Sequence, residues 1–343
     1  MNFSYYPYNL PFKYPFTISR GTKTHQPTLI VELDHFGIKG YGEAPAISYY
    51  HMTVEKMVEE LELKRSLIEN FAFTEPLRYW HYLHHLFPTN NFLVCALDIA
   101  AWDLYGKIRK LPIYKLWGLT FENVPLTDYT IGIDDVEKMI EKLKEKPWPV
   151  YKIKLGTTDD IKIITALRNH TRSLFRVDAN SAWTADEALD KIPSLKKLGV
   201  EFIEQPLDKN DWRGMKLLYE KSEIPLIADE SCVMEADVEK CAGYFHGINI
   251  KLTKCGGITP AKRMIDKARK LNLKVMMGSM NETSIGSAAI AHFLPMIDYV
   301  DMDGPLLLDK DVATGLTISD GVVAVSGKPG LGIEFIEPSK SIL

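Results

Sequence analysis

The 343-residue sequence has few of the features that mark secreted, disulfide-stabilised or membrane-spanning chains. It contains only four cysteines, without a CxxC pair or the spacing of a zinc site, so neither a disulfide framework nor a zinc site is expected. Its first residues lack a basic segment followed by a continuous apolar run, and no uncharged apolar stretch reaches about 18 residues. A reducing, cytoplasmic location fits best, and neither secretion nor membrane insertion is expected.

An excess of charge of one sign is also missing. The 41 Lys and Arg residues nearly balance the 45 Asp and Glu residues, for a net charge of -4. No overall field would attract nucleic acid or an anionic membrane surface, so a small molecule is the expected partner. The composition, 46% hydrophobic and 25% charged, is ordinary for a folded protein, and the length suggests one large domain and one smaller one.

What the sequence does contain is a repeat of strand-like segments at intervals of about 24 residues, beginning near residue 124. The stretches between them carry apolar residues at helical spacing, so each interval holds one buried parallel strand, one helix and two short connections. The strand-like segments read VPLTDYTIGI, VYKIKLG, LFRVDAN, VEFIEQP, IPLIADES, GINIKLT, KVMMGSM and YVDMDGP. They predict an α/β fold, a (β/α)7β TIM-type barrel over residues 116–313. The alternative, a doubly wound open sheet, would normally carry a glycine-rich phosphate loop after its first strand, and none follows TDYTIGI.

Residues 1–115 do not follow this repeat. TLIVELDHFG and IKGYGEAP alternate in polarity and predict a short antiparallel sheet, whereas residues 54–69 and 93–108 have the pattern of helices. The pattern predicts an α+β capping domain. Residues 314–343 return to short strands and turns and are expected to complete that domain.

Charged residues follow the predicted barrel strands, at the end where barrel enzymes place their active sites. Asp178, Glu204 and Asp229 end three consecutive strands, so three carboxylates should lie side by side. Adjacent anions repel one another unless a cation lies among them, and an all-oxygen set suits Mg²⁺, with Mn²⁺ as the second choice. The sequence therefore predicts a magnesium site at this rim.

Two lysines, Lys152 and Lys154, are two positions apart on one strand and should both point into the barrel. Each should disfavour the charged form of the other, which is how a lysine becomes a base. Lys251 lies four strands further on, roughly across the barrel. Lysines on both sides of one carbon, together with Mg²⁺, suggest abstraction of a proton next to a carboxylate, an enediolate, and inversion of that carbon.

The motifs KIK, DAN, EQP, ADES and INIKLTKCGG, in this order and spacing, resemble the enolase superfamily and within it the muconate lactonizing branch. GYGEAP and ALDIAAWDLYGK near the beginning and GKPGLG near the end extend the resemblance over nearly the whole chain. The resemblance implies that Lys154 and Lys251 are the bases on the two faces of the substrate and that Lys152 supports the site. It also implies metal ligands at Asp178, Glu204 and Asp229, with Asn180 and Glu230 in supporting positions.

The last barrel strand narrows the resemblance to the dipeptide epimerases of this family. Asp301 and Asp303 are two positions apart, as in those enzymes, where the pair receives the free α-ammonium group of the substrate. Arg20, counted back from GEA, matches the position of an arginine that binds the glutamate side chain in Ala-Glu epimerases, and an arginine suits a carboxylate. The resemblance implies further substrate contacts at Thr130, Met280 and Glu282.

We therefore predict a Mg²⁺-dependent dipeptide epimerase that inverts the α-carbon of the C-terminal residue of Ala-Glu or a related dipeptide. Asn281 and the pair Ser181 and Ala182 depart from the Ala-Glu pattern, so the preferred side chain stays open. Two alternatives remain. One is an o-succinylbenzoate synthase or muconate cycloisomerase of the same superfamily, whose substrates offer no ammonium group to Asp301 and Asp303. The other is a noncatalytic barrel that binds a peptide or metabolite, and a homo-oligomer is compatible with each.

Overall fold

The computed structural model describes residues 1–18 and 21–336, and an eight-stranded parallel sheet is its largest element. Neighbours in the sheet follow chain order, and the first and last strands meet at a parallel bridge between Thr127 and Val300, so the sheet forms a nearly closed barrel. The fold class predicted from the repeat is confirmed. The strands are β4 (Tyr129–Ile131), β5 (Val150–Lys154), β6 (Leu174–Asp178), β7 (Val200–Glu204), β8 (Leu226–Ala228), β9 (Gly247–Ile250), β10 (Lys274–Gly278) and β11 (Tyr299–Asp301).

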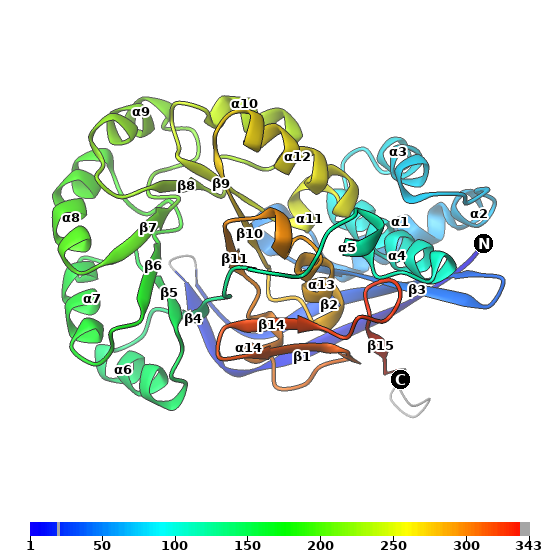
Figure 1. The fold of residues 1–343 in the computed structure, drawn as a ribbon, viewed down its shortest axis with the longest axis horizontal. Helices are drawn as coiled ribbons and strands as arrows, with labels where there is room; N and C mark the ends of the chain where they lie inside the picture. Colours follow the sequence, from blue (N-terminus) through cyan, green and yellow to red (C-terminus); the bar gives the residue numbers. More distant parts are fainter. Residues whose placement is uncertain (19–20, 337–343) are drawn as a thin grey trace.

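Helices between the strands surround the curved sheet, as Figure 1 shows for α6 to α10. The outer helices bury an apolar stripe, as in α6, where Met139 and Leu143 are four positions apart and both buried. The sequence also fixes where helices begin, since Thr184 and Glu187 form a reciprocal capping box at the start of α8. The helices of the barrel are α6 (Val136–Glu145), α7 (Asp160–Arg168), α8 (Ala185–Lys197), α9 (Trp212–Lys221), α10 (Val238–Cys241), α11 (Leu252–Cys255), α12 (Ile258–Lys270), α13 (Ser284–Ala291) and α14 (Gly304–Leu307).

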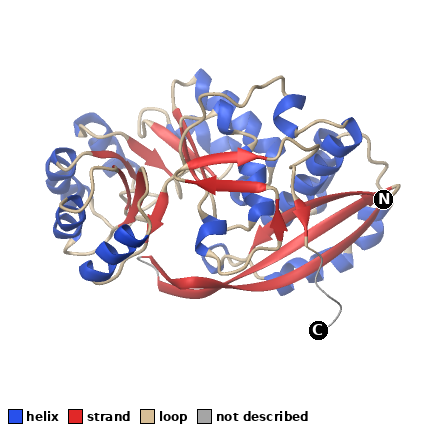
Figure 2. Ribbon diagram, turned by 60° about the horizontal axis from the view of Figure 1, so that its bottom comes forward, coloured by secondary structure: helices blue, strands red, loops and turns tan. Residues whose placement is uncertain are grey.

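The N-terminal segment forms a three-stranded antiparallel sheet of β1 (Asn2–Ile18), β2 (Gly21–His35) and β3 (Ile38–Pro45). Figure 2 shows how far its first two strands extend beside the barrel. The predicted antiparallel pairing is confirmed for β2 and β3, but the sheet is larger than predicted because β1 was missed. Its prolines argue against a strand, yet β1 is at the edge of the sheet, where a missing N–H is tolerated. Helices α1 (Val54–Leu63), α2 (Arg65–Glu69), α3 (Pro76–Leu86) and α4 (Asn91–Arg109) follow.

The C-terminal segment lies against α4 and against one face of the first sheet. Leu331 donates its N–H to Asp103 Oδ1 on α4 at 2.8 Å, and the ring of Phe335 lies close to those of Tyr6 and Tyr41. The division at residues 115 and 314 stays a prediction. The short strands here are β12 (Ala313–Thr314), β13 (Leu316–Ser319), β14 (Val322–Val325) and β15 (Glu334–Phe335).

Two buried carboxylates of the N-terminal segment bind helix N-termini of the barrel. Asp98 on α4 accepts hydrogen bonds from the N–H and the hydroxyl of Thr259, both at 2.8 Å, in the first turn of α12. Glu43 on β3 accepts hydrogen bonds from Thr283 Oγ1 at 2.6 Å and Gly286 N at 2.9 Å, at the start of α13. Carboxylates satisfy the free N–H groups at a helix N-terminus and complement its dipole. These bonds hold the two parts of the chain together.

Asp98 is expected to make stability depend on pH. Burial raises its pKa to about 7, against the opposing hydrogen bonds from Thr259. The folded state then holds a proton that the unfolded state releases, so stability should fall as pH rises from about 4 to about 7 and then level off. In Asp98→Asn, which has no titratable group at this position, the free energy of unfolding should decline by a few kcal/mol less over this pH range. Urea unfolding of both proteins at pH 4.5, 6 and 8 measures the difference, and parallel pH profiles would contradict it.

No helix within residues 1–18 and 21–336 has both the length and the apolar composition needed to cross a bilayer.

Candidate active site

A pocket of about 430 Å³ opens at the carboxyl ends of the barrel strands. The far end of the β1–β2 hairpin reaches the barrel near β4 and β5, and its residues form one wall of the pocket (Figure 1). The segment 47–50 and the segment 279–281 form other walls. Of the predicted site residues, the pocket is lined by Thr130, Lys152, Lys154, Asn180, Asp229, Glu230, Lys251, Met280, Asp301 and Asp303.

Lys152 lies among three carboxylates at the base of this pocket. Its Nζ is 2.7 Å from Glu204 Oε2, 2.8 Å from Asp301 Oδ2 and 3.2 Å from Asp178 Oδ2. Burial opposes the charge, but Asp301, Glu204 and Asp178 hold the pKa of Lys152 well above its usual value. The prediction that its lysine neighbour would disfavour the charged form was wrong for Lys152.

Lys154 and Lys251 enter the pocket from strands that are four apart in the order of eight, β5 and β9. Lys154 Nζ is 2.6 Å from Asp178 Oδ2, and Lys251 Nζ is 2.9 Å from Asp229 Oδ2. Burial opposes the charge on Lys251, but Asp229 raises its pKa above the usual value. Strands half a barrel apart face each other, so the two ammonium groups flank the pocket.

The three carboxylates predicted to bind metal lie on neighbouring strands. Asp178 and Glu204 are register partners on β6 and β7, and Asp229 follows β8 directly. Burial and the negative charge of Asp178 raise the pKa of Glu204 to about 7. Burial also acts on Asp178, yet Lys154 and Lys152 lower its pKa to about 2, and Lys251 and Lys254 similarly hold the pKa of Asp229 well below its usual value.

These residues fit a hard divalent cation by their chemistry. Within residues 1–18 and 21–336, no three Asp, Glu, His or Cys side chains lie close enough together to coordinate one metal ion as they stand. All three side chains nevertheless offer oxygen, as Mg²⁺ prefers. Glu204 Oε2 is fully buried and forms an ion pair with Lys152 Nζ at 2.7 Å, but it accepts no hydrogen bond of good geometry, so it keeps a lone pair for a ligand bond.

Asp301 and Asp303 lie together at the end of β11, beside β4. Asp303 Oδ2 accepts a hydrogen bond from the N–H of Thr130 at 2.6 Å, and Asp301 pairs with Lys152. Burial and then Asp301 raise the pKa of Asp303 to about 7, whereas Lys152 and Lys154 overcome burial and lower that of Asp301. The structure therefore brings these two carboxylates to one end of the pocket.

One predicted substrate contact, Glu282, does not line the pocket. Glu282 is buried behind the segment 279–281, where its Oε2 accepts the N–H of Met280 at 2.6 Å. Burial and the neighbouring Glu43 raise the pKa of Glu282 to about 8. Its position does not support a role in substrate binding. Arg20 lies outside the described residues.

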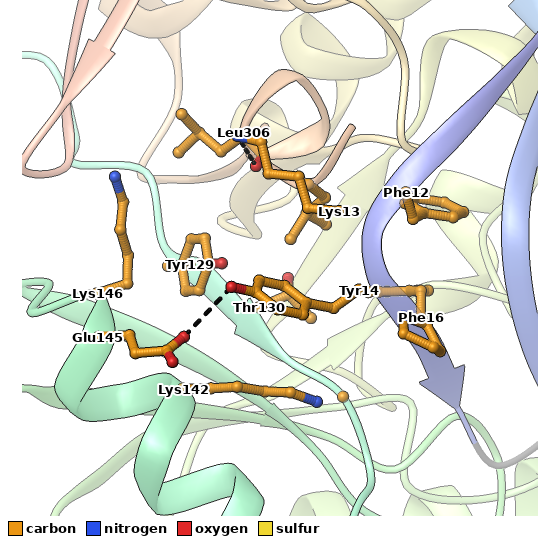
Figure 3. A pocket seen from close by; sticks show the side chains of 13 residues that line it. Phe12, Lys13, Tyr14, Phe16, Tyr129, Thr130, Lys142, Glu145, Lys146 and Leu306 are labelled. Atoms are coloured by element: carbon orange, nitrogen blue, oxygen red, sulfur yellow. Dashed lines mark hydrogen bonds between the residues drawn. The ribbon is translucent and has the colours of Figure 1, made fainter. Parts of the chain in front are cut away.

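A second pocket of about 190 Å³ shares Phe16 and Thr130 with the first (Figure 3). It lies between the end of β1, α6 and α14, where Lys13 donates to the carbonyl of Leu306 at 2.9 Å. Thr130 is the only predicted site residue among those lining it in the described part of the chain. The predicted catalytic residues therefore line the first pocket and not the second.

The comparisons with known proteins agree with this geometry. Residues 134–339 match the family described as "Enolase C-terminal domain-like", and residues 5–118 match "Mandelate racemase / muconate lactonizing enzyme, N-terminal domain". The chain belongs to the enolase superfamily.

Several enolase superfamily members are similar to this chain over nearly their full length. A relative from Flavobacterium johnsoniae, named L-Ala-D/L-amino acid epimerase, is 50% identical over 329 residues, which cover 96% of this chain and 98% of the relative. The structure of a substrate-liganded complex of the L-Ala-D/L-Glu epimerase from Bacillus subtilis has a TM-score of 0.91 at 29% identity, covering 97% of this chain and 98% of that one. A dipeptide epimerase from Enterococcus faecalis, solved with Mg and the dipeptide L-Leu-L-Tyr, has a TM-score of 0.89 at 29% identity, covering 97% and 98%. This superfamily member is an isomerase, a racemase or epimerase acting on amino acid derivatives.

Sequence reasoning missed two residues that contact the predicted metal ligands of this enolase superfamily member. Asn249 donates its side-chain N–H to Glu204 Oε1 at 2.8 Å, and Lys254 donates to Asp229 Oδ1 at 2.7 Å. Asn249 is two positions before Lys251 on β9, so its inward direction could have been inferred from strand periodicity. Lys254 follows the strand, and no periodicity indicated its direction.

Proposed function

We propose that the protein is a Mg²⁺-dependent dipeptide epimerase that inverts the α-carbon of the C-terminal residue of Ala-Glu or a related dipeptide. The reaction is a two-base 1,1-proton transfer through an enediolate. The observation that carries the proposal is the placement of Lys154 and Lys251 on opposite sides of a pocket that ends at Asp301 and Asp303. The relatives named as dipeptide epimerases support it.

The mechanism follows from the arrangement of these side chains. Asp301 and Asp303 receive the α-ammonium group of the first residue, which places the α-carbon of the second residue between the two lysines. One lysine removes the α-proton from its face and the other delivers a proton to the opposite face, so the configuration inverts. The roles exchange when the reaction runs in reverse.

Asp178, Glu204 and Asp229 would hold the Mg²⁺. Bound there, the ion supplies positive charge that stabilises the negative charge developing on the substrate carboxylate. Lys152 adds a fixed ammonium next to Glu204 and Asp178, at 2.7 and 3.2 Å. Apolar residues of β1 and of the segment 47–50, among them Phe16 and Ile47, line the pocket and would limit the access of water to the reacting carbon once substrate fills it.

The pocket wall bears on the choice of substrate. Phe16, Ile18, Ile47 and Met280 give it apolar surface, and Lys23 is a cation in the same wall. We therefore expect both glutamate and apolar residues to be accepted at the second position. All four cysteines are free and buried, which suits the proposed cytoplasmic location, and a homo-oligomer stays a prediction.

Incubation of L-Ala-L-Glu with the enzyme and Mg²⁺ in D₂O tests the function directly. We expect the α-proton signal of glutamate to disappear in the ¹H NMR spectrum while signals of L-Ala-D-Glu appear. The alanine α-proton serves as an internal control and should persist. If a panel of acidic, apolar and basic dipeptides shows neither exchange nor inversion, the proposal is wrong.

Asp303→Asn is expected to weaken recognition of the free ammonium group. A hydrogen bond to a charged group contributes about 1.5–3 kcal/mol, so kcat/KM for L-Ala-L-Glu should fall by about 10- to 150-fold, mainly through KM. For N-acetyl-L-Ala-L-Glu, which lacks the ammonium charge, the substitution should lower kcat/KM far less. Asp309→Asn, at an exposed carboxylate a few residues away, is the matched control.

The alternatives predict other outcomes. An o-succinylbenzoate synthase or muconate cycloisomerase would turn over its cyclic acid and would not need the charge of Asp303. A noncatalytic binding barrel would show no exchange with any dipeptide and would bind peptides equally well without Lys154 or Lys251.

A further inference from the structure

Lys254 is a fully buried lysine that does not line the substrate pocket. Its Nζ donates to Asp229 Oδ1 at 2.7 Å and to the backbone carbonyl of Asp229 at 2.6 Å. It also donates to the carbonyls of Cys232 at 2.9 Å and Asn249 at 3.3 Å. The ammonium group is thus enclosed by oxygen atoms from the ends of β8 and β9, behind the rim of the barrel.

The three proposed metal ligands share one pattern of contacts. Each has one carboxylate oxygen that accepts a hydrogen bond from a group other than the pocket lysines, while the other oxygen is directed toward a pocket lysine. These donors are the backbone N–H of Asn180 to Asp178 Oδ1 at 2.9 Å, the side chain of Asn249 to Glu204 Oε1 at 2.8 Å, and Lys254 to Asp229 Oδ1 at 2.7 Å. The lysines on the other side are Lys154 at Asp178, Lys152 at Glu204 and Lys251 at Asp229.

Charge balance alone does not explain Lys254. Lys251, 2.9 Å from Asp229 Oδ2, already neutralises that carboxylate. Burying a second ammonium costs several kcal/mol, which the surrounding hydrogen bonds must offset. Lys254 also donates to the backbone carbonyls of Asp229 itself and of Cys232, three residues later, so it can fix the orientation of the Asp229 side chain as well as balance its charge.

We propose that Lys254 is a positioning residue that fixes the Asp229 carboxylate with Oδ2 facing the pocket. Lys251 is then free to turn toward the substrate without releasing Asp229, and the carboxylate stays in place for the divalent cation. This inference rests on the proposed function, because it assigns Asp229 to the cation and Lys251 to proton transfer.

Two variants of Lys254 distinguish a role in positioning Asp229 from a role in balancing its charge. Loss of a nearby positive charge should by itself tighten the binding of a cation, whereas loss of a positioning contact weakens it. We expect Lys254→Met to weaken Mg²⁺ binding about 10- to 100-fold, the usual range for residues that orient metal ligands. Lys254→Arg keeps the charge but changes the shape of the donor, and it too should bind Mg²⁺ more weakly than the wild type.

The primary measurement is the Mg²⁺ dissociation constant, determined by calorimetry on the full-length protein without substrate. Thermal unfolding and kcat/KM for L-Ala-L-Glu accompany it. Lys107→Met is the matched control, because it removes another lysine paired with a buried carboxylate, Asp103, at 2.7 Å. It should lower stability and leave the Mg²⁺ dissociation constant within about twofold of the wild type, as expected for a distant site.

Unchanged or tighter Mg²⁺ binding by Lys254→Met, or unchanged binding by Lys254→Arg, would overturn the inference. If Lys254→Met does not fold, Lys254→Arg decides alone, since a charge-only role predicts no change for it. A wild-type protein that binds no Mg²⁺ would refute the proposed function and this inference together. Wild-type binding with unaffected variants refutes the inference alone.

Discussion

Lys154→Ala and Lys251→Ala are each expected to abolish inversion while leaving proton exchange with only one of the two epimers. The two lysines enter the pocket from β5 and β9, on opposite sides, so each can reach only one face of the α-carbon. In Lys251→Ala, Lys154 can still remove and return a proton on its own face. One epimer should then take up deuterium in D₂O without changing configuration, and Lys154→Ala should show this with the other epimer.

The rate of inversion should fall by at least about 10²–10⁴ in each variant, the usual contribution of a general base. Both L-Ala-L-Glu and L-Ala-D-Glu are followed by ¹H NMR. Lys142→Ala is a suitable control, because Lys142 pairs with Asp134 at 3.0 Å and faces the second pocket (Figure 3). Inversion at the wild-type rate in either variant, or exchange of the same epimer in both, would contradict the two-base arrangement.

Removal of divalent metal is expected to reduce activity to background. Asp178, Glu204 and Asp229 are buried and offer only oxygen atoms, which suit Mg²⁺ and Mn²⁺. After treatment with EDTA and dialysis, either ion should restore turnover. Binding to the folded state should also raise the free energy of unfolding by about 2.7 kcal/mol when Mg²⁺ is at about 100 times its dissociation constant.

The stability effect is measured by thermal unfolding at increasing Mg²⁺, with Na⁺ at equal ionic strength as the control. Glu204→Gln should reduce both the recovery of activity and the thermal shift, because it removes one of the three buried negative charges that would hold the cation. Full activity in protein shown by elemental analysis to be free of divalent metal would disprove the dependence.

The barrel could be predicted from the sequence because a fixed interval between buried strands leaves few other closed arrangements. The same reasoning located Asp178, Glu204 and Asp229, since parallel strands end at one rim. β1 could not be found this way: its prolines are acceptable only because that strand lies at an edge, and edge position is a property of the assembled sheet.

Charge states and directions of side chains were also beyond the sequence. The ammonium of Lys152 is stabilised by Asp301, which is 149 residues further along the chain. Glu282 follows a barrel strand as the other site residues do, yet it turns toward Glu43 and away from the pocket. Both outcomes depend on contacts between distant segments, and a local pattern carries no information about them.

The hydrogen bonds of Glu43 bear on how the chain acquires its structure during synthesis. Thr283, which it binds, is 240 residues later in the sequence. At a synthesis rate of about 5–20 residues per second, β3 leaves the ribosome roughly 10 to 50 seconds before its partner helix exists. Until the end of that interval the apolar side of the N-terminal sheet and α4 has no complete barrel to cover it. Chaperone binding to the nascent chain should therefore be strongest before α13 emerges, and truncated chains that end before this helix should aggregate.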